Sequence, residues 1–472
     1  MLIRLPTRMN RTCLALVVAA LAWRTVPAIH AQESTSFSTT PPHSAKEKPL
    51  PDRLPDKPSL APAFTIPVEP LGFSAPGPIY LGQRNSLASL DFIDDNKLLF
   101  TFRVPGLMHR EAEDREWGDE RQIRAVVLAL PAGNVTAEAL WTVHDRVRYL
   151  WMLKDGHFLL RNRDGLEQGD STLELKPLLH FPGPLLWLEM DPSQQFLITN
   201  SREPATTQAK PGDVASPPTA QADISYPEQN AQGAQKAQQV PQNPQDQPES
   251  KDRKPNPPDL VVRILKRDSG KVMLVSRARA AVHLPINSDG YVESLRANGE
   301  QWMLNLTYFS GGSTVLGRVS STCSPSFDFI SQRELLVTAC DGGGGHRLVA
   351  MGLDGHRLWE NPSSPQAIWP LLVMAPDGSR LVRETLAVNH AVNAYSPLDA
   401  EDIKGQLVRV YDAATGKVAL EASATPALDA GGNVAISPSG RRVAILHDGA
   451  IEVFDLPEPP ALSIAADSRA AH

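Results

Sequence analysis

The chain has 472 residues and a formal net charge of -7, with a sequence pI of about 6.0. A net acidic chain that carries no basic stripe argues against nucleic acid as a partner. Its 42 prolines and 31 glycines favour turn-rich β structure over helix bundles. Repeat architectures keep chains of this length in a single domain, so length alone does not require several domains.

Residues 1–31 have the pattern of a secretory signal peptide. Three arginines within the first 11 residues precede an apolar run at 14–22 that is too short to span a bilayer. We expect cleavage after Ala31, with a site after Ala22 as second choice and an uncleaved membrane anchor as the alternative. Cys13 precedes the apolar run and is misplaced for lipid attachment. The prediction is an exported protein, periplasmic or extracellular, with no membrane span after signal cleavage.

Composition predicts where the folded domain begins and ends. Residues 32–77 contain many Pro, Ser and Lys and show no sustained periodicity, which predicts a disordered leader. Residues 203–259 are dense in Pro, Gln and Ala, and such a segment buries too little apolar surface to offset its ordering entropy. We therefore expect one folded domain at 78–465, interrupted by a disordered insertion at 203–259 and followed by a disordered tail at 466–472. A solvated loop is the simplest role for the insertion, and a docking tether for a partner is the alternative.

The end of the domain shows a pattern that the rest of the chain copies. In residues 433–457, three apolar runs are separated by the turn sequences Pro438-Ser439-Gly440 and His447-Asp448-Gly449. Short apolar runs between Gly, Pro and Asp are typical of an antiparallel meander. Six further strand–turn–strand units are expected, with turns near residues 94–96, 155–156, 191–193, 298–299, 331–333 and 376–378.

Pairs of outer strands are expected between several of these units, most clearly at 407–418, with copies at 261–272, 348–359 and 125–141. One such sheet cannot bury both of its faces, so repeated copies predict radial stacking into a propeller. The folded residues divide into about 46 per unit if there are seven units. We predict an all-β fold, a single β-propeller of seven blades; six or eight blades would also fit this length.

The strongest repeats resemble known propeller families. The segment VRVYDAATGK at 408–417 resembles the third strand and turn of a WD-repeat blade, with Tyr411-Asp412 at the Trp-Asp position of that family. The segments MAPDGSRLV at 374–382 and ISPSGRRVAIL at 436–446 are similar to the strand–turn–strand units of TolB-like periplasmic propellers. The resemblance implies a bacterial exported propeller architecture and does not imply an activity.

The chain shows no phosphate-binding Gly loop, no His-Glu-x-x-His, no Cys-x-x-Cys and no nucleophile elbow. Gly169-Asp170-Ser171 is expected to be a turn, and residues 341–346 a hairpin tip. Residues 144–146 and His390 could supply a base or metal ligand, but each lacks a second ligand at short spacing. The mixed-charge run at 109–117 fits a solvated loop or a partner-facing loop. The sequence therefore identifies no catalytic, cofactor-binding or metal-binding residue.

Aspartates recur in the expected turns. Several turn carboxylates that converge on a central channel could hold a cation such as Ca²⁺. Turn formation explains each of them without a metal, because Asp side chains bond to nearby backbone N–H groups. Both interpretations are open for Asp94, Asp95, Asp155, Asp377 and Asp448.

Two further predictions concern how the domain is held together. The last unit has three strands, so a strand from the other end of the chain is expected to complete it. Ile79-Tyr80-Leu81 is the first candidate for this strand, and Leu462-Ser463-Ile464 is the second.

Cys323 and Cys340 remain after signal cleavage and flank the fifth expected hairpin. A turn centred between Ser331 and Gln332 would place the two directly opposite each other in an antiparallel pair, within bridging distance. Export adds an oxidising compartment, so we predict a disulfide. Two buried, unbridged cysteines are the alternative.

Without a reactive constellation, the sequence favours a non-catalytic exported binding scaffold with an unidentified protein or glycan partner at the propeller face and no cofactor. The alternative is an enzyme, a lactonase or glycan-active hydrolase that uses channel carboxylates with or without Ca²⁺. Convergence of three or more acidic or His side chains would favour the enzyme, and a bare, apolar channel would favour the scaffold.

Overall fold

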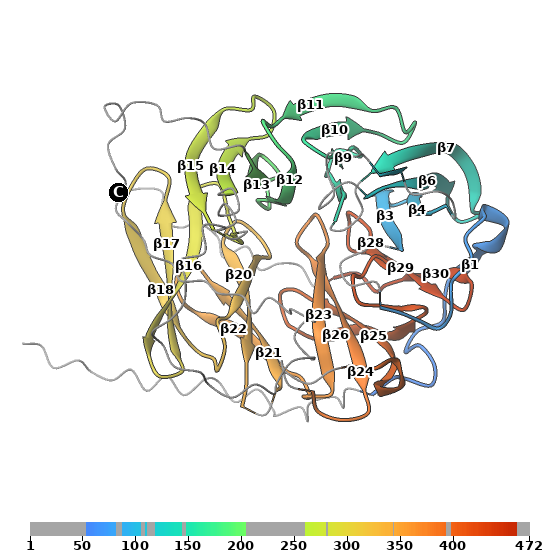
Figure 1. Ribbon diagram of the computed structural model, residues 1–472. Coiled ribbons are helices and arrows are strands. Elements are labelled where there is room, and N and C mark those ends of the chain that lie inside the picture. The colour runs from blue at the N-terminus through green and yellow to red at the C-terminus, as the bar shows by residue number, and fades with distance from the viewer. Residues whose placement is uncertain are drawn as a thin grey trace, which may run out of the picture. The chain divides into compact units, whose positions relative to one another are not determined.

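The computed structural model describes residues 53–81, 87–104, 109–110, 119–143, 148–203, 260–279, 282–342, 344–392 and 398–459 (Figure 1). All of these residues belong to one compact unit within Pro49–His472. The predictions of a signal peptide, a disordered tail and most of the insertion concern residues outside this description.

Almost all regular structure in the described residues is β-strand, and the helical elements there are two 3-10 turns, η1 (Glu69–Leu71) and η2 (Ala400–Asp402). Seven antiparallel meanders follow in chain order, and we number them as blades 1 to 7. Blade 1 comprises β3 (Ala88–Asp94), β4 (Lys97–Arg103), β6 (Asp119–Ala129) and β7 (Asn134–Val143). Blade 2 comprises β8 (Leu150–Met152), β9 (Phe158–Asn162), β10 (Gly165–Gly169) and β11 (Lys176–His180). Blade 3 comprises β12 (Leu185–Met190), β13 (Phe196–Arg202), β14 (Leu260–Lys266) and β15 (Val272–Ala278).

The remaining blades follow the same order. Blade 4 comprises β16 (Gly290–Asn298), β17 (Gln301–Tyr308) and β18 (Ser313–Ser320). Blade 5 comprises β19 (Ser326–Phe329), β20 (Glu334–Cys340), β21 (His346–Gly352) and β22 (Arg357–Pro362). Blade 6 comprises β23 (Ala367–Met374), β24 (Arg380–Val388), β25 (Ile403–Asp412) and β26 (Val418–Ala424). Blade 7 comprises β28 (Val434–Ile436), β29 (Arg442–His447), β30 (Ala450–Asp455) and the N-terminal strand β1 (Phe64–Pro67). The short β5 (His109–Arg110) extends blade 1, and β2 (Ile79–Tyr80) pairs in parallel with β27 (Ala427–Leu428).

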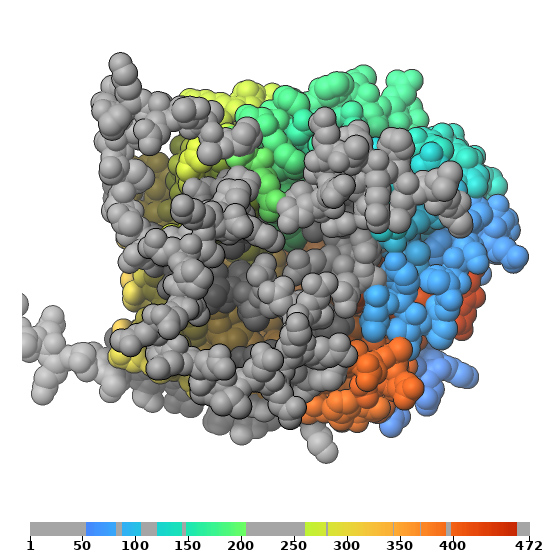
Figure 2. Space-filling model, viewed as in Figure 1, coloured from blue at the N-terminus to red at the C-terminus, as the bar shows by residue number. Residues whose placement is uncertain are grey.

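The first strands of blades 1, 2, 6 and 7 lie innermost, because first strands of neighbouring blades contact one another: β3 contacts β8 and β28, and β28 contacts β23. Apolar clusters fill the spaces between blades. One joins Leu90 and Phe92 of blade 1 to Leu446 of blade 7, and another joins Trp151 of blade 2 to Leu188 of blade 3. Blades 2 and 3 occupy adjacent parts of the outer surface (Figure 2, green and yellow-green). The predicted seven-bladed, all-β propeller is confirmed.

The blades have two distinct ends. At one, which we call the turn end, the first strand joins the second and the third joins the fourth. At the other, the crossing end, the second strand joins the third and the chain crosses to the next blade. In blade 3 the crossing end is marked by the pairing of Arg202 with Leu260, and the turn end by that of Met190 with Leu197.

Blade 4 departs from the expected pattern. Its predicted hairpin forms β16 and β17, but an extended segment at 282–287 takes the innermost position that a first strand occupies in other blades. Ile286 bridges Tyr291 of β16, and the Asn200 side chain of blade 3 bonds the backbone of Val282 at 2.9 and 3.0 Å. The hairpin therefore supplies the second and third strands of its blade.

The N-terminal strand β1 closes the ring by pairing with β30, from Phe64 opposite Val453 to Pro67 opposite Ala450. The prediction that Ile79–Leu81 completes the last blade is wrong, because Ile79 and Tyr80 pair with β27 instead. The closing strand also lies inside the stretch expected to be a disordered leader, which is incorrect for residues 53–77. A four-residue strand that ends in proline gives too weak a periodic signal to be recognised from sequence.

We expect that residues 204–258 can be excised with little loss of stability. Because Arg202 and Leu260 are already paired at the ends of β13 and β14, a short Gly-Ser turn can join the flanks without moving either strand. Loop-closure entropy changes only logarithmically with length, so the thermal midpoint is expected to shift by about a few degrees at most. Calorimetry of the excised and full-length proteins provides the comparison. Loss of cooperative unfolding would contradict this expectation.

Candidate functional site

The recurrent turn carboxylates serve their own turns. Each of the following accepts a hydrogen bond from the backbone N–H two residues later, at 2.7–3.2 Å: Asp94, Asp155 and Asp377. Asp95 accepts bonds from the N–H and hydroxyl of Ser439 at 3.3 and 2.9 Å and so joins the turns of blades 1 and 7. Within the described ranges, no group of three His, Cys, Asp or Glu residues is arranged to hold a metal ion.

The other sequence candidates lie apart from one another. His390 is half exposed, and its Nδ1 lies 3.5 Å from Oδ1 of Asp402 near η2. Asp170 accepts bonds from the N–H and hydroxyl of Thr172 at 2.7 and 2.6 Å, which forms a turn. The N–H of Asp341 bonds the Gly345 carbonyl at 2.8 Å between β20 and β21. Residues 144–146 lie outside the described residues, as do the side chains of 109–117.

A charged cluster that the sequence did not predict lies on the innermost segments of blades 3, 4 and 5. Its members are Glu189 of β12, His283 of the extended segment and Asp328 of β19. The carboxylate of Glu189 accepts hydrogen bonds from Nδ1 of His283 and from the indole Nε1–H of Trp187. Nε2 of His283 faces the carbonyl oxygen of Phe327 at 3.2 Å. Because both ring nitrogens face acceptors, only the imidazolium form satisfies both bonds.

Electrostatics agree with this protonation state. Burial alone lowers the pKa of His283, but attraction and hydrogen bonding to Glu189, with help from Asp328 and the Phe327 carbonyl, raise it to about 9. Burial raises the pKa of Asp328, a shift that His283 opposes and Glu189 reinforces. At neutral pH the cluster holds a charged imidazolium between two carboxyl groups. Such an imidazolium has no lone pair with which to act as a general base.

A second charged pair lies between blades 1 and 2, where Asp91 of β3 faces Arg148. Burial raises the pKa of Asp91 to about 6, against the attraction of Arg148 and a 2.6 Å hydrogen bond from the Ser89 hydroxyl. The guanidinium of Arg148 also lies 5.7 Å from the ring centre of Trp151 and donates to the Leu150 carbonyl at 2.9 Å. Both charges are therefore held by neighbouring groups of the propeller.

A third polar group lies between blades 6 and 7. Glu384 of β24 is 1% exposed, and its Oε2 accepts a 2.8 Å hydrogen bond from Nε2 of Gln406. Gln406 Oε1 in turn accepts bonds from the N–H of Leu428 at 2.9 Å and from Nδ2 of Asn433 at 2.7 Å. Burial raises the pKa of Glu384 to about 8, so this carboxyl is protonated at neutral pH.

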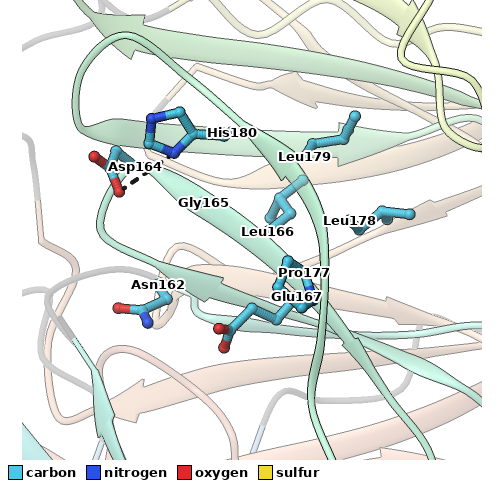
Figure 3. Close-up of a pocket in the computed structure, with 9 residues that line it drawn as sticks. All are labelled: Asn162, Asp164, Gly165, Leu166, Glu167, Pro177, Leu178, Leu179 and His180. Carbon is cyan, nitrogen blue, oxygen red and sulfur yellow. Dashed lines mark ion pairs between the residues drawn. The ribbon is translucent and has the colours of Figure 1, made fainter.

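An open cavity of about 300 Å³ lies on the outer part of blade 2. Figure 3 shows its lining from β9, β10 and β11, with Leu166, Leu178 and Leu179 beside the polar pair Asp164 and His180. The Nδ1 of His180 lies 3.9 Å from Oδ1 of Asp164, and both side chains are well exposed. The lining brings together no nucleophile with a base, so this cavity is a weaker candidate than the inner cluster.

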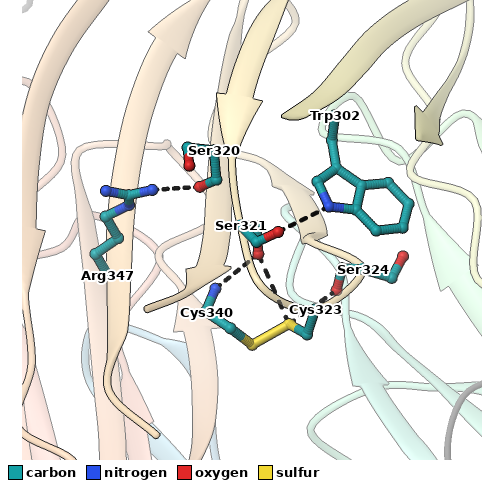
Figure 4. Close-up of a disulfide and its surroundings, with 7 residues drawn as sticks. All are labelled: Trp302, Ser320, Ser321, Cys323, Ser324, Cys340 and Arg347. Atoms are coloured by element: carbon teal, nitrogen blue, oxygen red, sulfur yellow. Dashed lines mark hydrogen bonds between the residues drawn. A yellow bond between two sulfur atoms is a disulfide. The ribbon is translucent and has the colours of Figure 1, made fainter. Parts of the chain in front are cut away.

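Cys323 and Cys340 are joined by a disulfide with their Cα atoms 5.5 Å apart, at the crossing end of blade 5 (Figure 4). The hairpin register differs from the expected one. Phe327 pairs with Val337, which centres the turn on residue 332, so Cys323 lies just before β19 and not directly opposite Cys340. The hydroxyl of Ser321 accepts the Cys340 N–H at 2.9 Å and holds the bridge against the start of the blade.

We expect thiol titration of a protein comprising residues 32–472, denatured and unreduced, to find no free thiol. Cys323 and Cys340 are the two cysteines of this range, and the bridge closes a short loop whose contribution to the free energy of unfolding is about 3 kcal/mol or less. Titration after reduction should find two thiols and serves as the control. Two free thiols without reduction would contradict the bridge.

The described residues contain no helix that is long and apolar enough to cross a membrane. No family model matches the chain, and no curated protein matches it. The architecture defines the chain as a seven-bladed β-propeller, in agreement with the resemblance to WD-repeat and TolB-like propellers.

Solved structures that it matches include an acylaminoacyl peptidase from Pyrococcus horikoshii, with 10% identity, a TM-score of 0.40 and coverage of 76% of this chain and 49% of that one. TolB from Acinetobacter baumannii matches with 12% identity and a TM-score of 0.34, over 74% of this chain and 75% of that one. Sqt1 from Chaetomium thermophilum, bound to the N-terminus of ribosomal protein L10, matches with 10% identity and a TM-score of 0.38, over 80% and 99%. This chain spans about half the length of the peptidase.

The inner cluster escaped the sequence analysis because its members are far apart in the chain. Glu189 and His283 are 94 residues apart. A local feature of the sequence could have identified two members of the cluster. Glu189 is an acidic residue in the otherwise apolar strand β12, and Asp328 is likewise the penultimate residue of β19. A carboxylate within a first strand of a propeller is therefore a better marker of the central region than a carboxylate in a turn.

Proposed function

We propose that the protein is an exported, non-catalytic binding propeller that engages a protein or glycan partner at the crossing end of its blades. The observation that carries the proposal is the state of the central charges. Glu189 is bonded to Trp187 and His283, and Asp91 is bonded to Ser89 and faces Arg148. Charges engaged in this way join neighbouring blades and are not poised to attack a substrate.

The distribution of connections supports the same proposal. Three connections at the crossing end are long: 57 residues lie between β13 and β14, 15 between β4 and β6, and 14 between β24 and β25, whereas blades 2, 5 and 7 have two, five and two residues there. At the turn end, two residues join β3 to β4 and five join β12 to β13. Long connections on a rigid scaffold are the usual carriers of binding residues.

Site-specific photo-crosslinking in the exporting cell tests this assignment. A photoreactive residue at Gln366, which is exposed at the crossing end of blade 6, is expected to yield a discrete crosslinked partner. The matched control is His356, which is also exposed and lies at the turn end of blade 5, and it should yield none. The purified partner should then bind the purified propeller. Equal crosslinking from both positions would contradict the crossing end as the binding face, and a protein retained in the cytoplasm would contradict export.

A hydrolase that acts on lactones or glycosides is a second candidate, favoured by the convergence of Glu189, His283 and Asp328. Three ionisable side chains in one place are what an enzyme of this kind requires. Hydrolysis of aryl lactones and aryl glycosides, with and without Ca²⁺, provides the test. Turnover by the wild type that is lost in Glu189→Gln would establish the enzyme and remove the non-catalytic proposal.

A further inference from the structure

The outer strand of blade 3 carries a concentration of exposed apolar side chains. Val272, Met273 and Val275 are 44%, 42% and 56% exposed. The described ranges contain eight large apolar residues that are at least 39% exposed, and three of them lie on this strand. β15 is the last strand of its sheet and pairs only with β14. Its outer row of backbone N–H and C=O groups has no strand partner within the described part of the chain, which makes it a template for a further strand.

The outer edges of blades 2, 6 and 7 are covered or guarded. The edge of β30 is covered by β1, and Ser59 bonds both the N–H and the carbonyl of Glu421 on β26, each at 2.8 Å. β11 begins with Lys176-Pro177, a pair that discourages strand addition. β15 contains no proline, and no charge interrupts it between Val272 and Ser276.

The two ends of β15 are basic although the chain as a whole is acidic. Residues 266–279 contain five basic residues and one acidic residue, whereas the chain carries a net charge of -7. The single acidic residue, Asp268, is bonded to Arg267 at 2.8 Å. Lys271 precedes the strand, Arg277 lies near its end and Arg279 follows it, and all three are exposed. The edge is therefore an apolar strip between positive charges.

We propose that β15 binds an extended polypeptide with an apolar centre and an acidic residue at each end, and that this segment adds to blade 3 as a fifth strand. Main-chain hydrogen bonds to the free edge supply affinity, and side chains on the face of Val275 and Arg277 supply specificity. The apolar side chains cover the strip formed by Val272, Met273 and Val275, while the carboxylates at the two ends meet Lys271 and Arg277. Charge disfavours a second copy as the occupant, because antiparallel pairing of two β15 strands would bring Lys271 of one copy close to Arg277 of the other.

Fluorescence anisotropy with a labelled peptide that has a run of Val at its centre and Glu at both ends tests the proposal. We expect saturable binding to the full-length protein, and none of a peptide with Lys in place of Glu. N-methylation of alternate peptide bonds should abolish binding, because it removes the donors that pair with the edge. Arg277→Glu and Val275→Lys should each weaken binding by about tenfold or more. The matched control is Val315→Lys on β18, since Val315 is also 56% exposed, and it should leave binding unchanged.

Several outcomes would overturn the proposal. Equal losses from Val275→Lys and Val315→Lys would place the binding elsewhere or make it nonspecific. Dimerisation of the wild type that Val275→Lys removes would assign the edge to a second copy. Binding that appears only after residues 204–258 are excised would assign the edge to that connection of the same chain.

Discussion

Deletion of residues 53–73 is expected to abolish cooperative folding of the propeller. The segment contributes β1, which pairs with β30, and four buried side chains, Ile66, Val68, Leu71 and Phe73. Each fully buried apolar side chain of this size contributes about 1.5–3 kcal/mol, so their loss is comparable to the whole free energy of unfolding of a typical domain. It also exposes the edge of β30. Far-UV circular dichroism and urea titration of the deleted protein give the result.

Point substitutions test whether the free energy of unfolding depends on the packing of individual side chains of this segment and not only on the presence of the segment. Phe73 packs edge-to-face on Phe100 and Phe102, with ring centres 5.4 and 5.6 Å apart, so Phe73→Ala should cost about 3–5 kcal/mol. Ile66→Ala should cost about 2–5 kcal/mol, whereas Thr65→Ala, at an exposed position of the same strand, should change the free energy of unfolding little. Equal effects of Ile66→Ala and Thr65→Ala would show that β1 does not pack as a closing strand.

The seven hairpin units were predictable from the sequence because each has a local signature. Pro376-Asp377-Gly378 and Pro438-Ser439-Gly440 specify tight turns, with positive φ at Gly378 and Gly440, between runs of apolar residues. The first segment of blade 4 has no such signature, because residues 282–287 contain a proline and make only an isolated bridge. Its position depends on contacts with Asn200 of the neighbouring blade, which no local pattern encodes.

The buried polar residues of β24 could not be predicted for a related reason. In the sequence RLVRETLAV four of the nine residues are polar or charged, which is typical of a partly exposed strand, yet all nine residues are buried. β24 is a second strand, with β23 on one side, β25 on the other and neighbouring blades against its faces. A polar residue in such a position must find a partner within the protein. For Glu384 that partner is Gln406, which lies 22 residues away.

Replacement of Glu384 by Gln is expected to stabilise the propeller at neutral pH. The folded pKa of about 8 lies above the ordinary glutamate pKa of 4.5, so the folded state binds a proton that the unfolded state releases. The stability linked to this proton is fully present below about pH 4.5 and is lost as the pH rises from there through about 8. Gln is neutral at every pH and can accept the same bond from Gln406. At pH 7 the gain should reach about 3–4 kcal/mol, from roughly 1.4 kcal/mol for each pH unit above 4.5.

The gain in free energy of unfolding should depend on pH if it comes from the proton bound by Glu384, and should not depend on pH if it comes from improved packing. The difference in free energy of unfolding between Glu384→Gln and the wild type should be near zero at pH 4.5 and should grow up to about pH 8, because only the wild type has a proton to lose. Glu401→Gln, at an exposed position of η2, is the matched control and should be close to neutral throughout. Urea titrations of the three proteins at pH 4.5, 6, 7 and 8 measure the slope. A gain of the same size at every pH would mean that the proton is not involved, and a loss at pH 7 would mean that the carboxyl is ionised in the folded protein.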